Sequence, residues 1–208
     1  MRKDAAKLGL VILFGLLTAQ VACGQDAAGE RLRFEYQPWS TQEEAAEEPK
    51  LRYGDEGFAS WVISYSAAYD TNAFDQGLTL SYNRFLVKDI EWLLEAGLWS
   101  FYDQGNDAAY GLSAGIGFRW HFLTRERWTI FADVGIALLG ATDAVPPEGT
   151  EFNFMPRVGV GFTHQIDENI RLIGGVRWHH ISNARTRGDD RNPSRDAPQL
   201  YVGLVVPF

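Results

Sequence analysis

A histidine and a serine two positions apart, His180 and Ser182, are the residues whose types and spacing best suit chemistry. On a β-strand, residues two apart lie on the same side, about 6.5 Å apart along the chain. The imidazole can then accept the hydroxyl proton and make the serine a nucleophile. A carboxylate must hold the imidazole in the correct tautomer. Asp196 is the candidate acid, and Asp189 and Asp190 compete with it.

The same pair also has a simpler interpretation. An H-x-S pattern is common, and it also fits a strand that emerges into water ahead of a solvated polar loop at 189–196. The choice between the two interpretations depends on the elements that position His180 and Ser182, and on what those elements face.

Apolar and polar residues alternate with period two from Phe58 onward, which predicts strands with one apolar and one polar face. The segment 110–122 shows this best, because every second residue from Tyr110 to Phe122 is apolar while glycine, Ser113, Arg119 and His121 fill the other positions. The pattern predicts about eight strands. They lie near 58–69, 77–86, 90–102, 110–122, 128–138, 152–165, 170–182 and 198–208.

These runs are about ten residues or longer, which suits a tilted strand that crosses a bilayer rather than the shorter strands of a soluble sandwich. The polar face mixes glycine and serine with charges that can pair inside a small closed barrel. We therefore predict an all-β fold, an eight-stranded antiparallel transmembrane β-barrel. The inward charges are Glu91, Glu95, Arg119, Asp133, Arg157, Arg171 and Arg177, and the girdle aromatics are Trp92, Trp120, Phe122, Trp128 and Trp178.

The connections predict the orientation of the barrel. The links at 87–89, 123–126 and 167–169 are short, whereas longer ones follow the third, fifth and seventh strands. Short periplasmic turns and longer extracellular loops are the rule for such barrels. The chain is thus expected to start and end in the periplasm, with Phe208 closing a C-terminal strand of the kind that the barrel-assembly machinery recognises.

The N-terminus has the pattern of an export signal over residues 1–24, in which a basic start precedes the apolar run 8–19. Cys23 is the single cysteine, so no disulfide within the chain is possible, and lipidation of Cys23 stays open. Residues 25–57 are rich in Gln, Glu and Ala, and this composition predicts an acidic mobile extension. The barrel is expected at 58–208.

Composition excludes two further classes of function. The net charge is −8 and no Lys/Arg-rich run is present, which argues against nucleic acid as a partner. The four histidines lack the spacing of metal ligands, and His179 and His180 face opposite ways on a strand, so neither a metal nor another cofactor is expected.

On the strand at 170–182, the outward row that includes Val176 and Trp178 continues to His180 and Ser182. Polar groups that face lipid cost free energy unless they are paired or lie at the interface, so an outward His and Ser fit either a paired catalytic site or a strand end that emerges into water.

The segments WHHISNA at 178–184 and NPSRD at 192–196, followed by a last strand that ends in Phe, resemble the PagL-type lipid A 3-O-deacylases. The resemblance implies an eight-stranded outer-membrane barrel with His180 as base, Ser182 as nucleophile, Asp196 as acid and Asn183 near the oxyanion hole. Three positions depart from that family's pattern. Asp196 replaces Glu, Arg185 replaces a frequent Gly, and Ser194 replaces Gly after Asn-Pro.

The resemblance predicts a serine ester hydrolase that removes an acyl chain, expected at the 3-O position, from lipid A of lipopolysaccharide in the outer leaflet of the outer membrane. Arg185, Arg187 and Arg191 are candidates for binding the lipid A phosphates, or form part of a solvated loop. The alternatives are a non-catalytic structural or adhesive barrel, and a soluble ligand-binding barrel.

Overall fold

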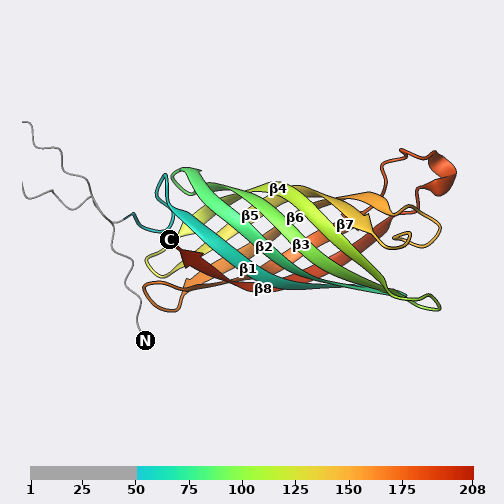
Figure 1. The fold of residues 1–208 in the computed structure, drawn as a ribbon. Coiled ribbons are helices and arrows are strands. Elements are labelled where there is room, and N and C mark those ends of the chain that lie inside the picture. The colour runs from blue at the N-terminus through green and yellow to red at the C-terminus, as the bar shows by residue number, and fades with distance from the viewer. Residues whose placement is uncertain (1–50) are drawn as a thin grey trace, which may run out of the picture. The chain divides into compact units, whose positions relative to one another are not determined.

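The computed structural model describes residues 51–208 as eight antiparallel strands closed into a barrel (Figure 1). Each strand pairs with the next in the chain, and β1 pairs with β8 to close the sheet. The fold is the all-β, eight-stranded barrel that the alternation predicts. The strands are β1 (Ala59–Asp70), β2 (Ala73–Val87), β3 (Ile90–Asp103), β4 (Ala109–Thr124), β5 (Trp128–Ala141), β6 (Phe152–Gln165), β7 (Arg171–Ile181) and β8 (Arg195–Pro207).

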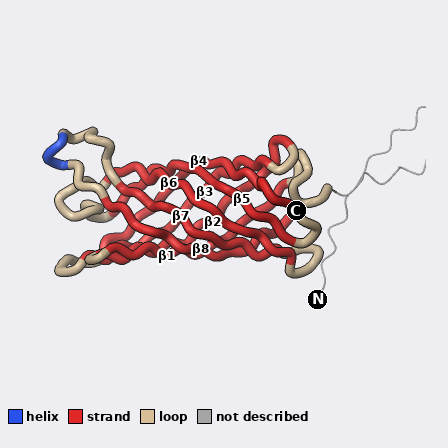
Figure 2. Tube along the Cα trace, turned by 180° about the vertical axis from the view of Figure 1, so that it is seen from behind, coloured by secondary structure: helices blue, strands red, loops and turns tan. Residues whose placement is uncertain are grey.

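The tube view shows strand along nearly the whole barrel wall, with loops at its two ends (Figure 2). A single short 3₁₀ helix, η1 (Asp189–Arg191), lies in the loop between β7 and β8. No helix within residues 51–208 is long and apolar enough to span a membrane. The start of β1 and the end of β8 are paired through Ser60 and Pro207, so both lie at the same end of the barrel.

Two strands begin earlier than predicted. β2 starts at Ala73 rather than 77, and β8 starts at Arg195 rather than 198. In both cases the added residues include a charged one that points inward, Asp75 or Arg195, and these two form a buried ion pair. The early start of β8 matters for function, because it makes Asp196 a strand residue instead of a loop residue.

The outer face of the barrel is apolar. Side chains such as Leu112, Ile116, Val160 and Leu200 are about half exposed or more, in rows that repeat every second residue. So large a continuous apolar surface would be unstable in water and suits contact with hydrocarbon.

The lumen is filled by polar side chains that pair with one another. Ion pairs join Glu91 to Arg119, Glu95 to Arg157, Asp133 to Arg177 and Asp75 to Arg195. Pairing is what makes buried charges tolerable at all, since an isolated one is strongly disfavoured. The predicted inward set is therefore confirmed, with Arg171 placed over the ring of Tyr53 at 4.2 Å.

Inward glycines allow close approach between neighbouring strands. A Cβ atom at Gly175 would lie 2.4 Å from the carbonyl oxygen of Val160, whereas a Cβ at the outward Gly140 would meet nothing within 4 Å. We expect Gly175→Ala to lower the free energy of unfolding in detergent by about 1–3 kcal/mol, because the packed wall must shift. Gly140→Ala is the matched control. Equal urea midpoints for both variants would contradict the packing account.

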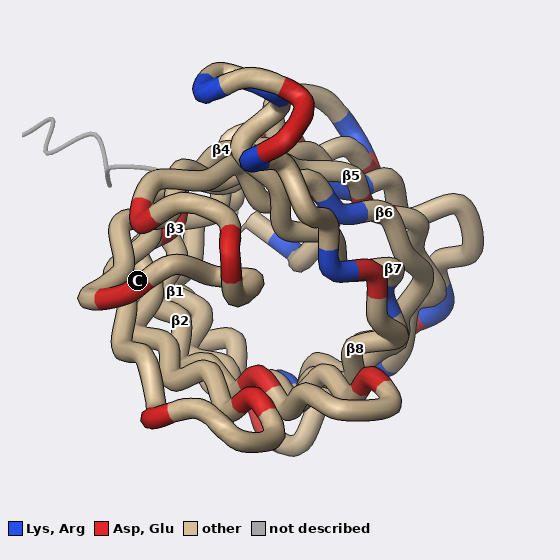
Figure 3. Tube along the Cα trace, turned by 90° about the vertical axis from the view of Figure 1, so that its right-hand side faces the viewer, with Lys and Arg blue, Asp and Glu red and all other residues tan. Residues whose placement is uncertain are grey.

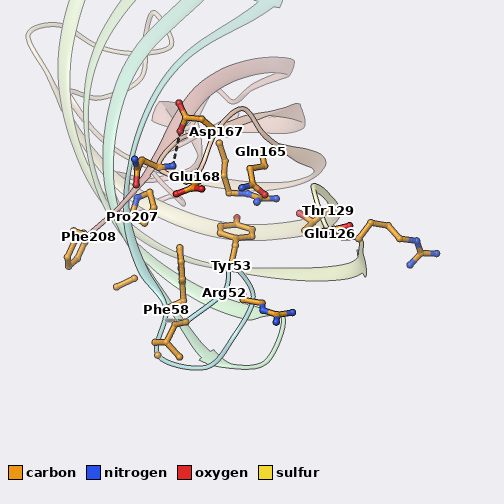
Figure 4. Close-up of a pocket in the computed structure, with 16 residues that line it drawn as sticks. Arg52, Tyr53, Phe58, Glu126, Thr129, Gln165, Asp167, Glu168, Pro207 and Phe208 are labelled. Carbon is orange, nitrogen blue, oxygen red and sulfur yellow. Dashed lines mark hydrogen bonds between the residues drawn. The ribbon is translucent and has the colours of Figure 1, made fainter. Parts of the chain in front are cut away.

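Residues 51–57, expected to belong to the extension, fold against the barrel instead. The Tyr53 ring lies in the lumen at the end of the barrel where β1 starts and β8 ends. Its centre is 5.2 Å from that of the Phe85 ring and 5.4 Å from that of the His121 ring. It points into a pocket between the strand ends (Figure 4). A ring with a place in the lumen gives this short stretch buried contacts with the barrel. The predicted signal at 1–24, Cys23 and the rest of the extension lie outside the described residues.

Candidate active site

His180 lies near the end of β7 and Ser182 just beyond it, at the end of the barrel opposite to the start of β1 and the end of β8. Their side chains project from the outer face, and the Nε2 atom of His180 is 2.8 Å from the Oγ atom of Ser182. The parity of the strand produces this contact, because Trp178, His180 and Ser182 follow one another on the same side.

Asp196 completes a relay on the neighbouring strand. In the register of β7 with β8, His180 is directly opposite Asp196, and the Oδ1 atom of Asp196 is 2.9 Å from the Nδ1 atom of His180. Directly opposed residues of an antiparallel pair have side chains on the same face, so the register places the carboxylate on the imidazole.

The two competing carboxylates lie away from His180. Asp189 and Asp190 are exposed in η1, and Asp189 forms an exposed ion pair with Arg185 at 3.1 Å. Of the three candidate acids, the structure thus brings only Asp196 into contact with the histidine.

The contacts are compatible with one tautomer. If Nδ1–H of His180 donates to the Asp196 carboxylate, Nε2 is left with a lone pair that accepts the Ser182 hydroxyl proton. This arrangement has the geometry of a serine–histidine–carboxylate relay. Ser182 itself is 8% exposed, so its hydroxyl lies at the edge of the surface rather than freely in solvent.

The backbone of Ser182 is held by β6. Ser182 and Phe154 exchange two backbone hydrogen bonds, of 2.8 and 3.1 Å. Between that bridge and the pair Arg157–His179, the ladder is interrupted at Pro156, which has no backbone N–H to donate. The serine is therefore anchored just beyond a gap in the sheet.

Trp178 and Ser194 surround the carboxylate of Asp196, and the sequence reasoning missed this role. Trp178 donates from Nε1 to Oδ1 of Asp196 at 2.9 Å, and its ring stacks on His180 at 5.2 Å. The Oγ atom of Ser194 lies 3.4 Å from Oδ2. The sequence pattern places Trp178 in the aromatic girdle. Its shared parity with His180 was the available signal, but the direction of the indole N–H is not readable from spacing.

Trp178→Phe is expected to keep the stacked ring and remove the donor to Asp196. A hydrogen bond to a charged group contributes about 1.5–3 kcal/mol. If part of this energy orients Asp196 in the transition state, kcat should fall about tenfold while KM changes little. Steady-state rates of fatty-acid release test this. Trp120→Phe, on the outer face of β4, is the control, and an equal loss in both would point to a general effect on the barrel.

Asn183 is buried and its side chain is engaged in the loop that follows. Its Nδ2 atom donates to the carbonyl oxygen of Arg191, which ties the two ends of the loop together. This hydrogen bond orders the loop and occupies the side-chain amide of Asn183. If Asn183 contributes to an oxyanion hole, it does so through its backbone N–H.

Ala184 and Arg185 both occupy the left-handed backbone region, with φ of 51° and 62°. That region costs a non-glycine residue roughly 1–2 kcal/mol. Arg185 thus replaces the frequent Gly at a position whose backbone conformation favours glycine.

Arg185→Gly removes the backbone strain of the positive φ, which raises the free energy of unfolding. Glycine also increases the entropy of the unfolded chain, which lowers it. We therefore expect the free energy of unfolding to rise or to stay unchanged. The lost ion pair with Asp189 is exposed on both sides and contributes little. Urea unfolding in detergent, with Arg187→Gly as the control, measures this. A clear loss of stability specific to Arg185→Gly would contradict the strain account.

Within residues 51–208, no group of three or more His, Cys, Asp or Glu side chains is arranged to hold a metal ion. The pocket that contains Tyr53 lies at the opposite end of the strands from His180 and Ser182.

Comparison with known families decides the relationship. The family model described as lipid A 3-O-deacylase (PagL) matches residues 28–205. The chain belongs to the PagL family. Membership places it among lipid A deacylases of the outer membrane, and the family's range includes His180, Ser182 and Asp196.

Solved structures support the fold. The outer-membrane enzyme PagL is similar with a TM-score of 0.55 and 18% identity, over 71% of this chain and 99% of that one. The N-terminal barrel domain of Pseudomonas aeruginosa OprF has a TM-score of 0.51 and 17% identity, over 74% of this chain and 100% of that one. At such identities the likeness concerns the barrel alone. The search of curated proteins found no match.

Proposed function

We propose that this protein is a serine hydrolase that removes the ester-linked acyl chain at the 3-O position of lipid A. The observation that carries the proposal is the relay from Ser182 through His180 to Asp196 on the outer face of the barrel. Its location in a member of the PagL family supports lipid A as the substrate.

The proposed reaction has two halves. The Oγ atom of Ser182 attacks the ester carbonyl while Nε2 of His180 takes its proton, and Asp196 stabilises the imidazolium that forms. The bond between the acyl carbon and the sugar oxygen then breaks, and His180 gives its proton to that oxygen, which leaves as the sugar hydroxyl. Water next attacks the acyl carbon of the acyl-serine while His180 takes its proton. The bond to Oγ of Ser182 breaks, His180 returns the proton to Oγ, and the fatty acid is released.

Backbone amides that follow Ser182 would stabilise the oxyanion of each tetrahedral intermediate. Preorganised donors of this kind often contribute the largest single share of rate enhancement. The loop after β7 changes direction at Ala184 and Arg185, the two residues with positive φ that follow Asn183.

The position of the relay suits a substrate anchored in the outer leaflet. His180 and Ser182 project from the barrel wall at the end that carries the long loops, where an ester near the lipid headgroup would lie. Seen down the barrel axis, basic residues gather near β7 and in the loop that follows it (Figure 3). We propose that Arg185, Arg187 and Arg191 of this loop bind lipid A phosphates.

The remaining parts of the chain have proposed roles in delivery. Residues 1–24 would direct export and be removed, and the barrel-assembly machinery would recognise β8 with its terminal Phe208. The barrel would then lie in the outer membrane with both chain ends in the periplasm.

The test is to incubate purified, detergent-folded protein with hexa-acylated lipid A and analyse products by mass spectrometry. We expect loss of one 3-hydroxyacyl chain and appearance of the free 3-hydroxy fatty acid. Loss of a secondary acyl chain would overturn the 3-O assignment. Unchanged lipid A, with the barrel shown to be folded, would favour the non-catalytic alternative.

A further inference from the structure

A buried ionic cluster lies on the lumen side of the barrel wall, directly behind the relay. It joins Asp75 of β2, Asp103 at the end of β3 and Arg195 at the start of β8. His179 of β7 completes it, with Nε2 at 3.5 Å from Oδ2 of Asp75. Asp75 is 1% exposed and Arg195 is 3% exposed, so the cluster is shielded from bulk water.

Each of the two lumen residues on β7 and β8 is the chain neighbour of a relay residue. Side chains alternate across a strand, so His179 points inward where His180 points outward, and Arg195 points inward where Asp196 points outward. His180 and Asp196 are also cross-strand partners. Whatever fixes His179 and Arg195 therefore fixes the backbone that carries the histidine and the acid.

Asp75 contacts both of these lumen residues. Its Oδ1 atom accepts a hydrogen bond from Nη1 of Arg195. Its Oδ2 atom lies 3.5 Å from Nε2 of His179, and neither of these two atoms has a hydrogen-bond partner within the described structure. Arg195 is held a second time by Asp103, through Nη2. On its other side, His179 stacks on the ring of Trp99 at 5.5 Å with the planes 14° apart. One carboxylate thus holds the start of β8 through a hydrogen-bonded ion pair and lies against the end of β7 through its contact with His179.

The buried ion pairs of Arg195 with Asp75 and Asp103 resist displacement of the start of β8. Removing one member of a buried ion pair leaves an uncompensated charge, so the partner must move toward water or toward a new partner. The relay depends on a short contact between two strands, and small displacements of catalytic groups cost large factors in rate.

We propose that Asp75 is a positioning residue for the reaction, which sets the distance between His180 and Asp196 through His179 and Arg195. The role of this residue in catalysis rests on the proposed function, whereas its effect on the geometry of His180 does not. Asp75 touches no substrate, since its side chain lies inside the barrel wall.

The barrel contains a close structural match to serve as a control. Glu91 is also 1% exposed, and it also accepts from an arginine, Arg119, and contacts a histidine, His121, at 3.1 Å. That cluster lies toward the other end of the strands, near Thr129 and Tyr53. Glu91→Gln therefore reproduces the loss of a buried carboxylate without touching the strand ends that carry the relay.

The experiment compares Asp75→Asn with Glu91→Gln in the full-length protein, folded in detergent. Proton NMR follows the low-field Nδ1–H signal of His180, assigned by its loss in Asp196→Ala. We expect this signal to weaken or shift in Asp75→Asn only. For lipid A hydrolysis, kcat should fall about tenfold to a hundredfold in Asp75→Asn with KM within about twofold. Glu91→Gln should keep both values once the folded fraction is matched.

An unchanged His180 signal in folded Asp75→Asn would overturn the proposal, and so would equal losses of kcat in the two variants. If the wild type leaves lipid A intact while the His180 signal changes only in Asp75→Asn, the proposed function fails and the positioning role stands. Should Asp75→Asn not fold, Arg195→Lys keeps the positive charge but reaches only one of the two carboxylates. It should weaken the same signal, and an unaltered signal would equally overturn the proposal.

Discussion

Ser182→Ala is expected to reduce the rate of fatty-acid release from lipid A by about 10⁴-fold or more. The physical reason is the loss of the atom that forms the acyl-enzyme, because the remaining oxyanion donors and substrate contacts can assist only direct attack by water. The Oγ atom removed is the one that lies 2.8 Å from Nε2 of His180. Release of 3-hydroxy fatty acid by the purified variant, measured by mass spectrometry, gives the rate.

Ser66→Ala is the matched control for that variant. Ser66 is a buried serine on the lumen side of β1, and its Oγ atom has no hydrogen-bond partner within the described structure, so its loss should cost little. A residual rate in Ser182→Ala within about tenfold of wild type would show that serine attack is not the main route. A similar loss in Ser66→Ala would indicate a disturbed barrel.

Asp196→Asn is the second large expected effect, with a loss in kcat of about 10⁴-fold. An amide that donates to Nδ1 of His180 would force the proton onto Nε2, which then cannot accept the proton of Ser182. Asp196→Glu, the residue usual in the family that the sequence resembles, should keep activity to within about tenfold, because a carboxylate on the same strand still reaches the imidazole.

Asp189→Asn provides the contrast, since its carboxylate lies in the exposed helix η1 and pairs with Arg185. We expect its rate to match that of the wild type. If Asp189→Asn were the inactive variant and Asp196→Asn the active one, the assignment of the acid would be reversed. Steady-state hydrolysis of the same lipid A sample by all three variants gives the comparison.

Much of the fold was predictable because the bilayer imposes a strict pattern on each strand. In β4 and β5, apolar residues recur at every second position, and the structure places these rows on the outer face as predicted. The starts of β2 and β8 were not found. Asp75 and Arg195 resemble loop residues in the sequence, and only their mutual pairing across the barrel makes an inward position favourable.

The candidate site was predictable in part for the same reason. Strand parity put His180 and Ser182 on one face, and the adjacency of two antiparallel strands favoured Asp196 over Asp189 and Asp190. What parity cannot supply is register. The direct opposition of His180 and Asp196 depends on how β7 and β8 pair, and so does the reach of Trp178 to the same carboxylate.

Two loop features also lay beyond the pattern. The engagement of Asn183 with the Arg191 carbonyl depends on the path of the whole loop. The insertion of Tyr53 into the lumen depends on a space among Phe85, His121 and Arg171 that several strands create together. Neither a propensity nor a spacing in the sequence reports contacts of this kind.

The central claim is that Ser182, activated by His180 and Asp196, is the nucleophile that cleaves lipid A. The most direct measurement is to titrate the folded protein with an alkyl fluorophosphonate, map the adduct by peptide mass spectrometry and follow the remaining lipid A hydrolysis. The account predicts one adduct per chain, on Ser182, and loss of activity in proportion to its formation. Full modification of Ser182 with undiminished hydrolysis, or inactivation through an adduct on another residue, would contradict it.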